Sequence, residues 1–299
     1  MTHTLTLIAN PEKQKLDASH AAMAVSCLPA AGDPEWLSDH ESCEIGFAPD
    51  SEADFIQASE SVKHAFSTMP IDIVSQPANK RRKKLLIADM DSTLIGQECI
   101  DELADYAGLK PKVAAITERA MRGEIEFEPA LRERVALLKG LEETVLQSVF
   151  DERITLMPGA RTLARTMSAN GATTVIVSGG FTFFTQRVAQ AAGFHQSHAN
   201  VLEISDGKLS GTVKKPILGQ QAKLDALRSY RDKLSLDHTE TLAVGDGAND
   251  LAMITEAGLG VAFRAKPIVA EKASASITHG DLTALLFAQG YSRAEFVED

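Results

Sequence analysis

Short apolar runs alternate with longer amphipathic stretches from residue 85 onward. The apolar runs have the length of single strands and read "KLLIAD", "TTVIVS", "TLAVGD", "LGVAF" and "SASIT". Runs of Leu, Ile and Val separated by helical patterns are typical of a parallel sheet that is covered by helices on both faces. The pattern therefore predicts an α/β domain over residues 80–299.

Two segments of this region depart from the alternation. Residues 100–157 separate the first strand from the second and have an almost purely helical pattern. Because this insert is longer than a connection needs, we expect it to form a helical cap over about residues 98–157. The later segment "HANVLEISDGKLSGTV" alternates in twos around Asp206-Gly207. Such a dipeptide between alternating segments predicts a hairpin with a type I′ turn.

The first 79 residues have a pattern of their own. Strand-like runs "TLTLIA", "CEIGFA" and "IDIVS" alternate with helical stretches at residues 16–28 and 51–68. This order predicts a small α+β domain over residues 1–79. The segment "SQPANKRR" that follows is rich in turn-forming and basic residues, and we interpret it as the linker.

Charge divides the chain in the same way. The net charge is -11, and residues 1–79 hold 3 Lys and Arg against 12 Asp and Glu. A basic stripe with interleaved aromatic residues is missing from the sequence, which argues against a nucleic-acid partner. The run "KRRKK" at residues 80–84 could bind phosphate, but its position directly before a strand favours a solvated linker.

Apolar content and cysteines bear on the type of protein. The chain has 299 residues and 44% hydrophobic content, enough for two domains with a sizeable core. Its apolar runs are far shorter than the roughly 18 to 20 residues that cross a bilayer, and its first residues do not resemble a secretory signal. The three cysteines are widely spaced and predict reduced thiols. We therefore expect a cytoplasmic protein without a membrane span.

Polar residues gather where three of the predicted strands end. In an open parallel sheet, ligands bind beyond the carboxyl ends of the strands, so these residues are the candidates for a site. The candidates are Asp89 and Asp91 after the first strand, Ser178, Gly179 and Gly180 after the second, Asp246, Asn249 and Asp250 after the third, and Lys223 in the helical segment "QQAKLDALRSY".

Each of these elements is weak evidence when it is taken alone. The pattern D-x-D also occurs in calcium loops and in metal-dependent transferases. A calcium loop of the EF-hand type is excluded, because Leu94 and Leu251 stand where its glycine would be. A Ser-Gly-Gly segment after a strand can be a simple turn, and a single lysine is most often solvated.

Taken together, the candidates predict a site for a cation and a phosphate. Four carboxylates at one edge of a sheet repel one another and lose hydration, unless a cation lies between them. Carboxylates with room for water and phosphate oxygens suit Mg²⁺. Ser178 and the N–H groups of Gly179 and Gly180 would bind an anion at the start of a helix, and Lys223 would add a mobile positive charge.

The segments "DMDSTL", "SGG", Lys223 and "GDGAND" resemble, in this order, the four motifs of the haloacid dehalogenase superfamily. The insert "QECIDELADYAG" and "AMRGEIEFEPALRERVALLKGL", with the later "VSGGF", "DGKLSG" and "AKPI", is similar to the phosphoserine phosphatase family over nearly all of residues 84–290. A dehalogenase of the superfamily lacks the second aspartate of D-x-D, so Asp91 favours phosphatase chemistry. The resemblance implies a Rossmann-like core with a helical cap, and Mg²⁺-dependent hydrolysis of O-phospho-L-serine as the last step of L-serine biosynthesis.

The resemblance also implies a role for each motif residue. Asp89 is the nucleophile that forms an aspartyl phosphate, and Asp91 is the general acid and base. Mg²⁺ is held by Asp89, the main-chain carbonyl of Asp91 and Asp246. Asp250 and Gly180 would support the site. The residues that would bind the substrate are Ser178, Gly179, Lys223 and Asn249.

Substrate choice is expected to lie in the cap. At positions that match the family, Glu98 would bind the ammonium of phosphoserine and Arg134 would bind its carboxylate with two hydrogen bonds. Met121 and Phe127 would close over the substrate, although apolar helix residues are often plain core.

Two other interpretations stay open at this point. The aspartyl phosphate could be transferred to an acceptor other than water, which would make the chain a phosphotransferase. Residues 1–79 resemble an ACT-type domain, with one strand fewer than its usual count and no glycine after the first strand in "IANPEKQ". That domain could bind serine as a regulatory module, or it could serve packing or the formation of a homodimer.

Overall fold

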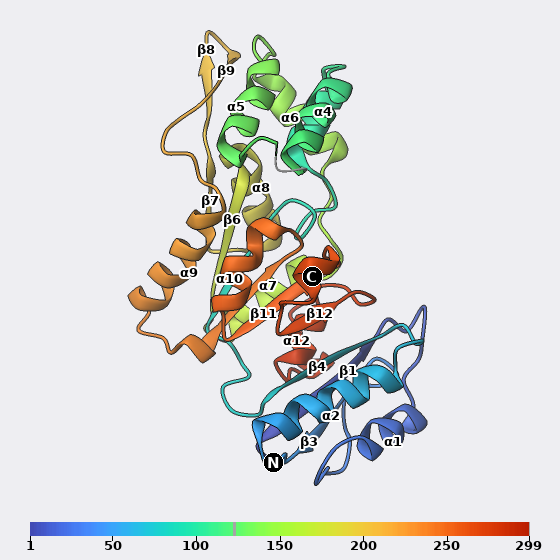
Figure 1. The fold of residues 1–299 in the computed structure, drawn as a ribbon. Helices are drawn as coiled ribbons and strands as arrows, with labels where there is room; N and C mark the ends of the chain where they lie inside the picture. The colour runs from blue at the N-terminus through green and yellow to red at the C-terminus, as the bar shows by residue number, and fades with distance from the viewer. Residues whose placement is uncertain (122–123, 299) are drawn as a thin grey trace.

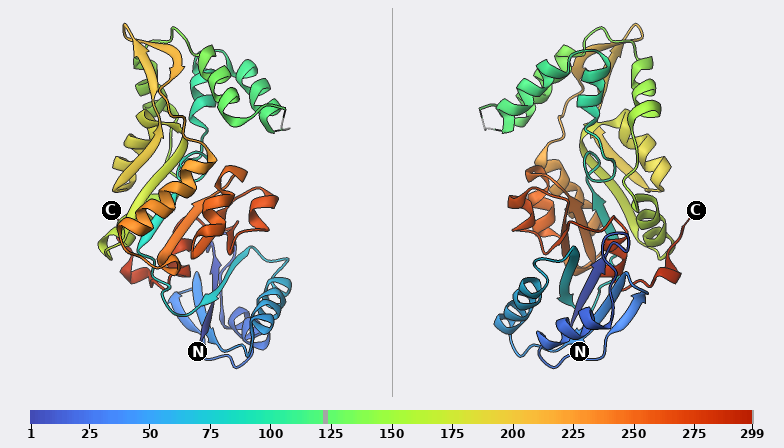
Figure 2. Two further views of the ribbon diagram at one scale, coloured as in Figure 1. Left: turned by 60° about the vertical axis from the view of Figure 1, so that its left-hand side comes forward. Right: turned by 90° about the vertical axis from the view of Figure 1, so that its right-hand side faces the viewer.

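The computed structural model describes residues 1–121 and 124–298 and consists of three parts arranged in a row (Figure 1). An N-terminal unit lies at one end, a parallel sheet with its helices lies in the middle, and the helical cap lies at the other end. Figure 2 shows from two further sides that the N-terminal unit and the cap lie at opposite ends of the core. Among the described residues, the helices are all too short or too polar to cross a membrane.

The core sheet has six parallel strands in the order β12-β11-β10-β5-β6-β7. Its strands are β5 Leu85–Ala88, β6 Thr173–Phe181, β7 Gln196–Asn200, β10 Thr241–Gly245, β11 Leu259–Phe263 and β12 Ala275–Ile277. The predicted α/β class is confirmed. The sequence missed β7, because its residues "QSHAN" are polar and carry neither of the two apolar patterns of a strand.

Helices cover both faces of this sheet, because neighbouring residues of each strand point to opposite sides. Leu85 and Ile87 pack with residues of α9 and α10, whereas Leu86 and Ala88 belong to the core formed with α7, α8 and α12. These helices are α7 Ala160–Ala169, α8 Thr182–Ala192, α9 Gln220–Lys233, α10 Leu251–Glu256, α11 Pro267–Ala270 and α12 Ala284–Ala288. The buried strands explain why their sequences are continuously apolar.

The insert between β5 and β6 forms the expected helical cap. It contains α3 Cys99–Tyr106, α4 Lys110–Met121, α5 Phe127–Leu137 and α6 Thr144–Arg153. The predicted hairpin is present as β8 Leu202–Ser205 and β9 Lys208–Val213, and Asp206 and Gly207 have the positive φ angles, 53° and 73°, that a type I′ turn needs. Hydrogen bonds from Gly140 N and Glu143 N to the carbonyls of Leu209 and Gly207, each 2.8 Å long, join the cap to this hairpin.

The N-terminal unit is an antiparallel sheet with two helices on one face. Its elements are β1 His3–Ala9, α1 Ala18–Ser26, β2 Glu35–Ser38, β3 Ser42–Phe47, α2 Glu52–Ala65 and β4 Ile71–Pro77, and its strand order is β2-β3-β1-β4. The short strand β2 supplies the strand that the sequence did not reveal. Leu5 and Leu7 pack with the two helices, whereas Ile8 and Val74, on the other face, belong to the core shared with α12.

The N-terminal unit is joined to the core by a buried carboxylate. Asp72, on β4, is 4% exposed and accepts hydrogen bonds of 2.7 to 3.1 Å from the N–H groups of Thr278, His279 and Gly280. The side chain of Gln76 donates a further bond of 2.6 Å across the interface to the carbonyl of Ala288. Since buried N–H groups need acceptors, these bonds fix the position of β4 against the end of β12.

The segment after β4 differs from the solvated linker that the sequence predicts. Strand β4 continues to Pro77, so only residues 78–84 connect the two units. Lys83 is 4% exposed and donates to the carbonyl of Thr239 at 2.8 Å, and burial lowers its pKa to about 8. Arg81 forms a half-buried ion pair of 2.8 Å with Glu44. The interpretation as a solvated linker is therefore wrong for these two side chains, which tie the units together.

Replacing Asp72 by Ala should destabilise the protein strongly. The change removes the acceptor of the N–H groups of residues 278–280, of which Gly280 is buried, and such losses cost about 2 to 3 kcal/mol of unfolding free energy. Urea unfolding measures this free energy. The control is Asp39→Ala, which removes an exposed carboxylate from the β2–β3 turn and should change stability by less than about 0.5 kcal/mol. Similar losses in the two variants would contradict the role of Asp72.

Candidate active site

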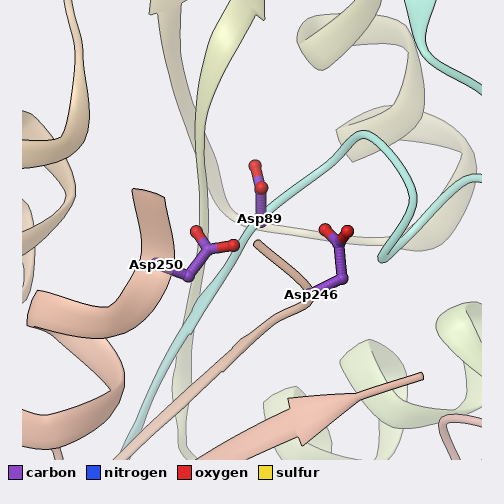
Figure 3. A group of neighbouring side chains, drawn as sticks. All are labelled: Asp89, Asp246 and Asp250. Atoms are coloured by element: carbon purple, nitrogen blue, oxygen red, sulfur yellow. The ribbon is translucent and has the colours of Figure 1, made fainter. Parts of the chain in front are cut away.

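Three carboxylates converge at the carboxyl edge of the core sheet, as Figure 3 shows. Asp89 directly follows β5, Asp246 directly follows the neighbouring strand β10, and Asp250 ends a short 3₁₀ turn that leads into α10. One carboxylate oxygen of each lies within 4.8 Å of the others. The prediction that these strand ends bring carboxylates together is confirmed.

This cluster is a suitable set of donors for a hard divalent cation. All three donors are carboxylate oxygens, and burial together with the charge of Asp89 raises the pKa of Asp246, so the cluster is electrostatically unfavourable on its own. Asp250 already accepts hydrogen bonds at both oxygens, from Lys223 at 2.6 Å and from Gly247 N at 3.0 Å. Asp89 is likewise contacted at both oxygens, by Met90 N and by Lys223, each at 2.7 Å, whereas Asp246 accepts a longer bond of 3.3 Å from Thr93. Asp246 is therefore the member that is held least tightly.

Glycine at position 245 makes this approach of the chain possible. A Cβ atom at Gly245 would lie 2.3 Å from Cγ of Asp250, which no side chain could tolerate. The strand end can therefore turn closely around the Asp250 carboxylate only because residue 245 has no side chain. In the segment "GDGAND", the first glycine therefore leaves space for the last aspartate.

Lys223 is buried beside two carboxylates of the cluster and is closed to solvent. Its side chain is 1% exposed, and Nζ lies 2.7 Å from Asp89 Oδ2 and 2.6 Å from Asp250 Oδ1. Burial lowers the pKa of Lys223, but the charges of Asp89 and Asp250 outweigh this effect and raise it. The expected mobile positive charge is therefore wrong: α9 and two carboxylates hold this ammonium in a fixed position.

Two hydrogen-bond donors hold the side chain of Asp91. Its Oδ1 accepts the N–H of Cys99 at 2.9 Å, and its Oδ2 accepts the hydroxyl of Ser178 at 3.2 Å. Burial raises the pKa of Asp91 to about 6, with a smaller contribution from the charge of Asp89. A carboxyl group with this pKa can both donate and accept a proton near neutral pH.

The segment Ser178-Gly179-Gly180 lies within β6 and not at the start of the helix. Strand β6 continues to Phe181 and α8 begins at Thr182. The N–H of Gly180, which the sequence suggested for binding an anion, instead donates to Ser178 Oγ at 2.9 Å. A Cβ atom at Gly180 would lie 2.8 Å from Asp91 Oδ2, so this glycine leaves space for the carboxylate. Its role in the structure is therefore close packing.

A cavity of about 510 Å³ lies between these residues and the cap. The lining residues that the sequence had singled out are Asp89, Asp91, Glu98, Phe127, Arg134, Ser178, Gly179, Gly180, Asp246 and Asn249. Phe127 lies over the core, because a Cβ atom at Gly179 would be 3.0 Å from its ring. The side chain of Met121 lies outside the described residues.

Glu98 and Arg134 bring opposite charges to the cap side of the cavity. Among the described residues, neither forms an ion pair; Arg134 donates only to the carbonyl of Ala130 at 3.3 Å and to the hydroxyl of Thr117 at 3.4 Å. Solvent reaches Glu98 through the cavity, yet withdrawal from bulk water and the charge of Asp91 raise its pKa to about 8. The cavity thus offers a basic and an acidic side chain that form no ion pair among the described residues.

Several residues of the site were missed by the sequence analysis. Thr93 donates to Asp246 Oδ1 at 3.3 Å, and Thr117 contacts Arg134 from α4. Lys266 lines the cavity, and its N–H donates to the carbonyl of Asp246 at 3.2 Å. Thr93 and Lys266 stand in the segments "DMDSTL" and "AKPI", so they could have been found there. Nothing in the sequence pattern singles out Thr117, which is one polar residue of an amphipathic helix.

This chain is similar to a known protein family and to known proteins. The family model described as haloacid dehalogenase-like hydrolase matches residues 86–255. The probable phosphoserine phosphatase of Schizosaccharomyces pombe is 45% identical over 240 residues, which cover 79% of this chain and 80% of the relative.

Solved structures agree as well. A probable phosphoserine phosphatase from Vibrio cholerae has a TM-score of 0.78 and 30% sequence identity, covering 98% of this chain and 88% of its own. A structure described as the phospho-aspartyl intermediate analogue of phosphoserine phosphatase has a TM-score of 0.64 and 40% identity, covering 69% of this chain and 98% of its own. The chain therefore belongs to the haloacid dehalogenase-like hydrolases and, among them, to the phosphoserine phosphatase family.

Proposed function

We propose that the chain hydrolyses O-phospho-L-serine to L-serine and phosphate through an aspartyl phosphate, which would complete the formation of L-serine. The observation that carries the proposal is the pairing of two half-sites across one cavity. Asp89 and Asp91 lie on its core side, and the unpaired Glu98 and Arg134 lie on its cap side. The first pair fits a phosphate ester, and the second fits the ammonium and carboxylate of an amino acid.

In the first step, a carboxylate oxygen of Asp89 attacks phosphorus, and the bond from phosphorus to the serine oxygen breaks. Hydrogen bonds from Met90 N at 2.7 Å and from Lys223 at 2.7 Å hold the Asp89 carboxylate in place. Asp91 gives its proton to the departing serine oxygen. The pKa of Asp91, raised by burial to about 6, supports this role because the group keeps a proton at higher pH than an ordinary aspartate.

In the second step, water attacks phosphorus and releases the Asp89 carboxylate and free phosphate. Asp91, now ionised, takes the proton of this water, so that both residues return to their initial states. The N–H of Cys99 and the hydroxyl of Ser178 hold the Asp91 carboxylate throughout. Their bonds support a fixed direction of proton transfer to the ester oxygen and from the water.

The cation of this site is proposed to be Mg²⁺. Asp89 and Asp246, with the main-chain carbonyl of Asp91, would hold it, and Asp250 would support them from behind. Oxygen donors near open space for water and phosphate fit this ion. When bound, Mg²⁺ neutralises charge on the transferring phosphoryl group. Ser178, Gly179 and Asn249 line the cavity where the phosphate would lie, and Lys223 acts on it through Asp89.

Residues 1–79 and 80–299 are proposed as the two domains, with about 98–157 as the cap. The separate sheets on either side of residues 78–84 support this division. The strand and helix order of the first unit now has the full β-α-β-β-α-β count of an ACT-type domain. Serine binding by this unit, a homodimer and a cytoplasmic location stay predictions.

Wild type should release phosphate from O-phospho-L-serine with Mg²⁺, and Asp89→Asn should abolish this release. The amide keeps the size of the side chain but is no nucleophile. Phosphate release is measured for both proteins with Mg²⁺, with EDTA, and with Mg²⁺ restored. No release from intact, metal-loaded wild type would overturn the phosphatase proposal. Activity of the wild type in EDTA would overturn the proposal that a cation is required. Activity of Asp89→Asn would overturn the proposal that Asp89 is the nucleophile.

Phosphothreonine should be a far better substrate than phosphoethanolamine. The first adds a methyl group to phosphoserine, which changes kcat/KM by about 10- to 200-fold, whereas the second lacks the carboxylate expected to bind Arg134, which costs about 10⁴- to 10⁵-fold. Arg134→Lys should reduce kcat/KM for phosphoserine much more than for phosphoethanolamine, because a lysine cannot form two parallel bonds with a carboxylate. The reverse order of the two substrates would show that the Arg134 assignment is wrong.

The metal-free protein should lose stability as the pH rises from about 5 to about 8. Folding raises the pKa of Asp91 to about 6 and that of Glu98 to about 8, above values near 4 in an unfolded chain. The folded state thus binds more protons, and this stabilising contribution is complete below pH ~4 and lost as the pH rises through the folded pKa values. Urea unfolding in EDTA across this pH range measures the loss.

The control for this pH dependence is a pair of Glu→Gln variants. Glu98→Gln should remove part of the decrease between about pH 7 and 8, because it removes the group with the highest of these pKa values. Glu12→Gln, at an exposed position near the N-terminus, should leave the decrease unchanged. Identical pH profiles for wild type and Glu98→Gln would contradict the raised pKa of Glu98.

A further inference from the structure

Ser92 has a backbone conformation that is unfavourable for its side chain. Its φ angle is 57°, in the left-handed region that glycine adopts freely and serine does not. Residues held in this region carry backbone strain and cluster at functional sites, where a compensating interaction keeps them. The hydroxyl of Ser92 is the natural place to look for such an interaction.

That hydroxyl donates to Glu98 Oε1 at 2.7 Å. Within the described residues, it is the sole hydrogen-bond donor to the Glu98 carboxylate. Ser92 itself does not line the cavity, whereas Glu98 does. The serine therefore contacts the carboxylate from behind and leaves its other side open to the cavity.

The loop between the two residues has fixed ends. Ser92 N donates to the carbonyl of Gln97 at 3.3 Å, which closes the loop. The Gln97 side chain bonds twice with Thr155, from Nε2 to the hydroxyl at 2.9 Å and from the Thr155 N–H to Oε1 at 3.1 Å. Since the main chain around Glu98 is held in this way, the remaining freedom is the rotation of its side chain, and the Ser92 bond limits that rotation.

Electrostatics alone would not keep Glu98 in this direction. When Glu98 is ionised, as binding of an ammonium requires, the charges of Asp91, Asp246 and Asp89 repel its carboxylate, and the charge of Arg134 attracts it. A free glutamate would rotate away from these carboxylates and lose the direction that a bound ammonium needs. Holding a flexible side chain in its binding rotamer before the ligand arrives removes the entropic cost of ordering it on binding, and one hydrogen bond to a charged group is strong enough to do so.

We propose that Ser92 is a positioning residue for Glu98 and thereby contributes to selectivity for substrates that carry an ammonium group. This inference rests on the proposed phosphoserine phosphatase function and extends it to a residue that does not contact the substrate.

The test compares Ser92→Gly with wild type on two substrates. One is O-phospho-L-serine, and the other is 3-phosphooxypropanoate, which has the same phosphate and carboxylate but no ammonium. Glycine accepts the φ angle of 57° without strain, so the variant removes the hydroxyl and keeps the backbone. We expect kcat/KM for phosphoserine to fall about 10-fold, mainly through KM, and that for the second substrate to stay within about twofold.

Two further variants make the result specific. Ser235→Gly makes the same change at an exposed serine with a φ angle of 54°, remote from the site, and should leave both substrates unaffected. Glu98→Gln should reduce kcat/KM for phosphoserine, and adding Ser92→Gly to it should cause little further loss, because the two residues act as one unit.

The outcomes separate this inference from the proposed function. If wild type does not hydrolyse phosphoserine, the function is overturned, and the inference with it. If wild type is active and Ser92→Gly behaves like wild type, or loses activity equally on both substrates, only the role of Ser92 is overturned. Additive losses in the Ser92→Gly/Glu98→Gln double variant would also overturn it.

Discussion

The repulsion between carboxylates at one edge of the core sheet is the constraint on which the rest of this structure depends. Asp89, Asp246 and Asp250 meet there, and the ammonium of Lys223 contacts Asp89 and Asp250. One such ammonium cannot balance three neighbouring negative charges, two of them buried, so the arrangement favours bound protons or a cation. A fold that served stability alone would avoid it. Lys223 contacts Asp89 and Asp250 and does not line the cavity, whereas Asp89 and Asp246 do. The negative charge of the cluster that Lys223 leaves unbalanced therefore faces the cavity.

The parallel sheet and the cap divide the work of recognition. Neighbouring parallel strands end at the same edge, so β5 and β10 bring their aspartates together without any long-range device. The cap contributes Arg134 and Phe127 from α5, and backbone bonds to the hairpin of β8 and β9 hold its other side. The proposed phosphate half of the site is thus built from strand ends, whereas the half proposed to select the rest of the substrate is built from helices of the cap.

The sequence predicts the first half much better than the second. Asp89 and Asp246 follow apolar runs that could only be buried strands, and the geometry of a parallel sheet then requires them to meet. For Lys223, the sequence predicts the helix but not the burial of the side chain. A lysine that the fold places between Asp89 and Asp250 has the same helical pattern around it as a solvated lysine. Strand β7 was missed for a similar reason, since its pairing with β6 depends on tertiary contacts and not on its polar sequence. The "KRRKK" run reads as solvated, since burial of Lys83 depends on the distant carbonyl of Thr239.

The loop after β5 shows how closely chemistry and selectivity are joined. Only six residues separate Asp91 from Glu98, and the first residue of α3, Cys99, returns to donate its N–H to Asp91. The same short segment therefore fixes the proposed acid at one end and the proposed ammonium ligand at the other. Gln97 also bonds to Thr155 where the chain leaves the cap, so this segment is tied to both chain connections of the cap. The proposed acid and the proposed ammonium ligand therefore share one support, and a change that displaces this segment would affect the chemistry and the selectivity together.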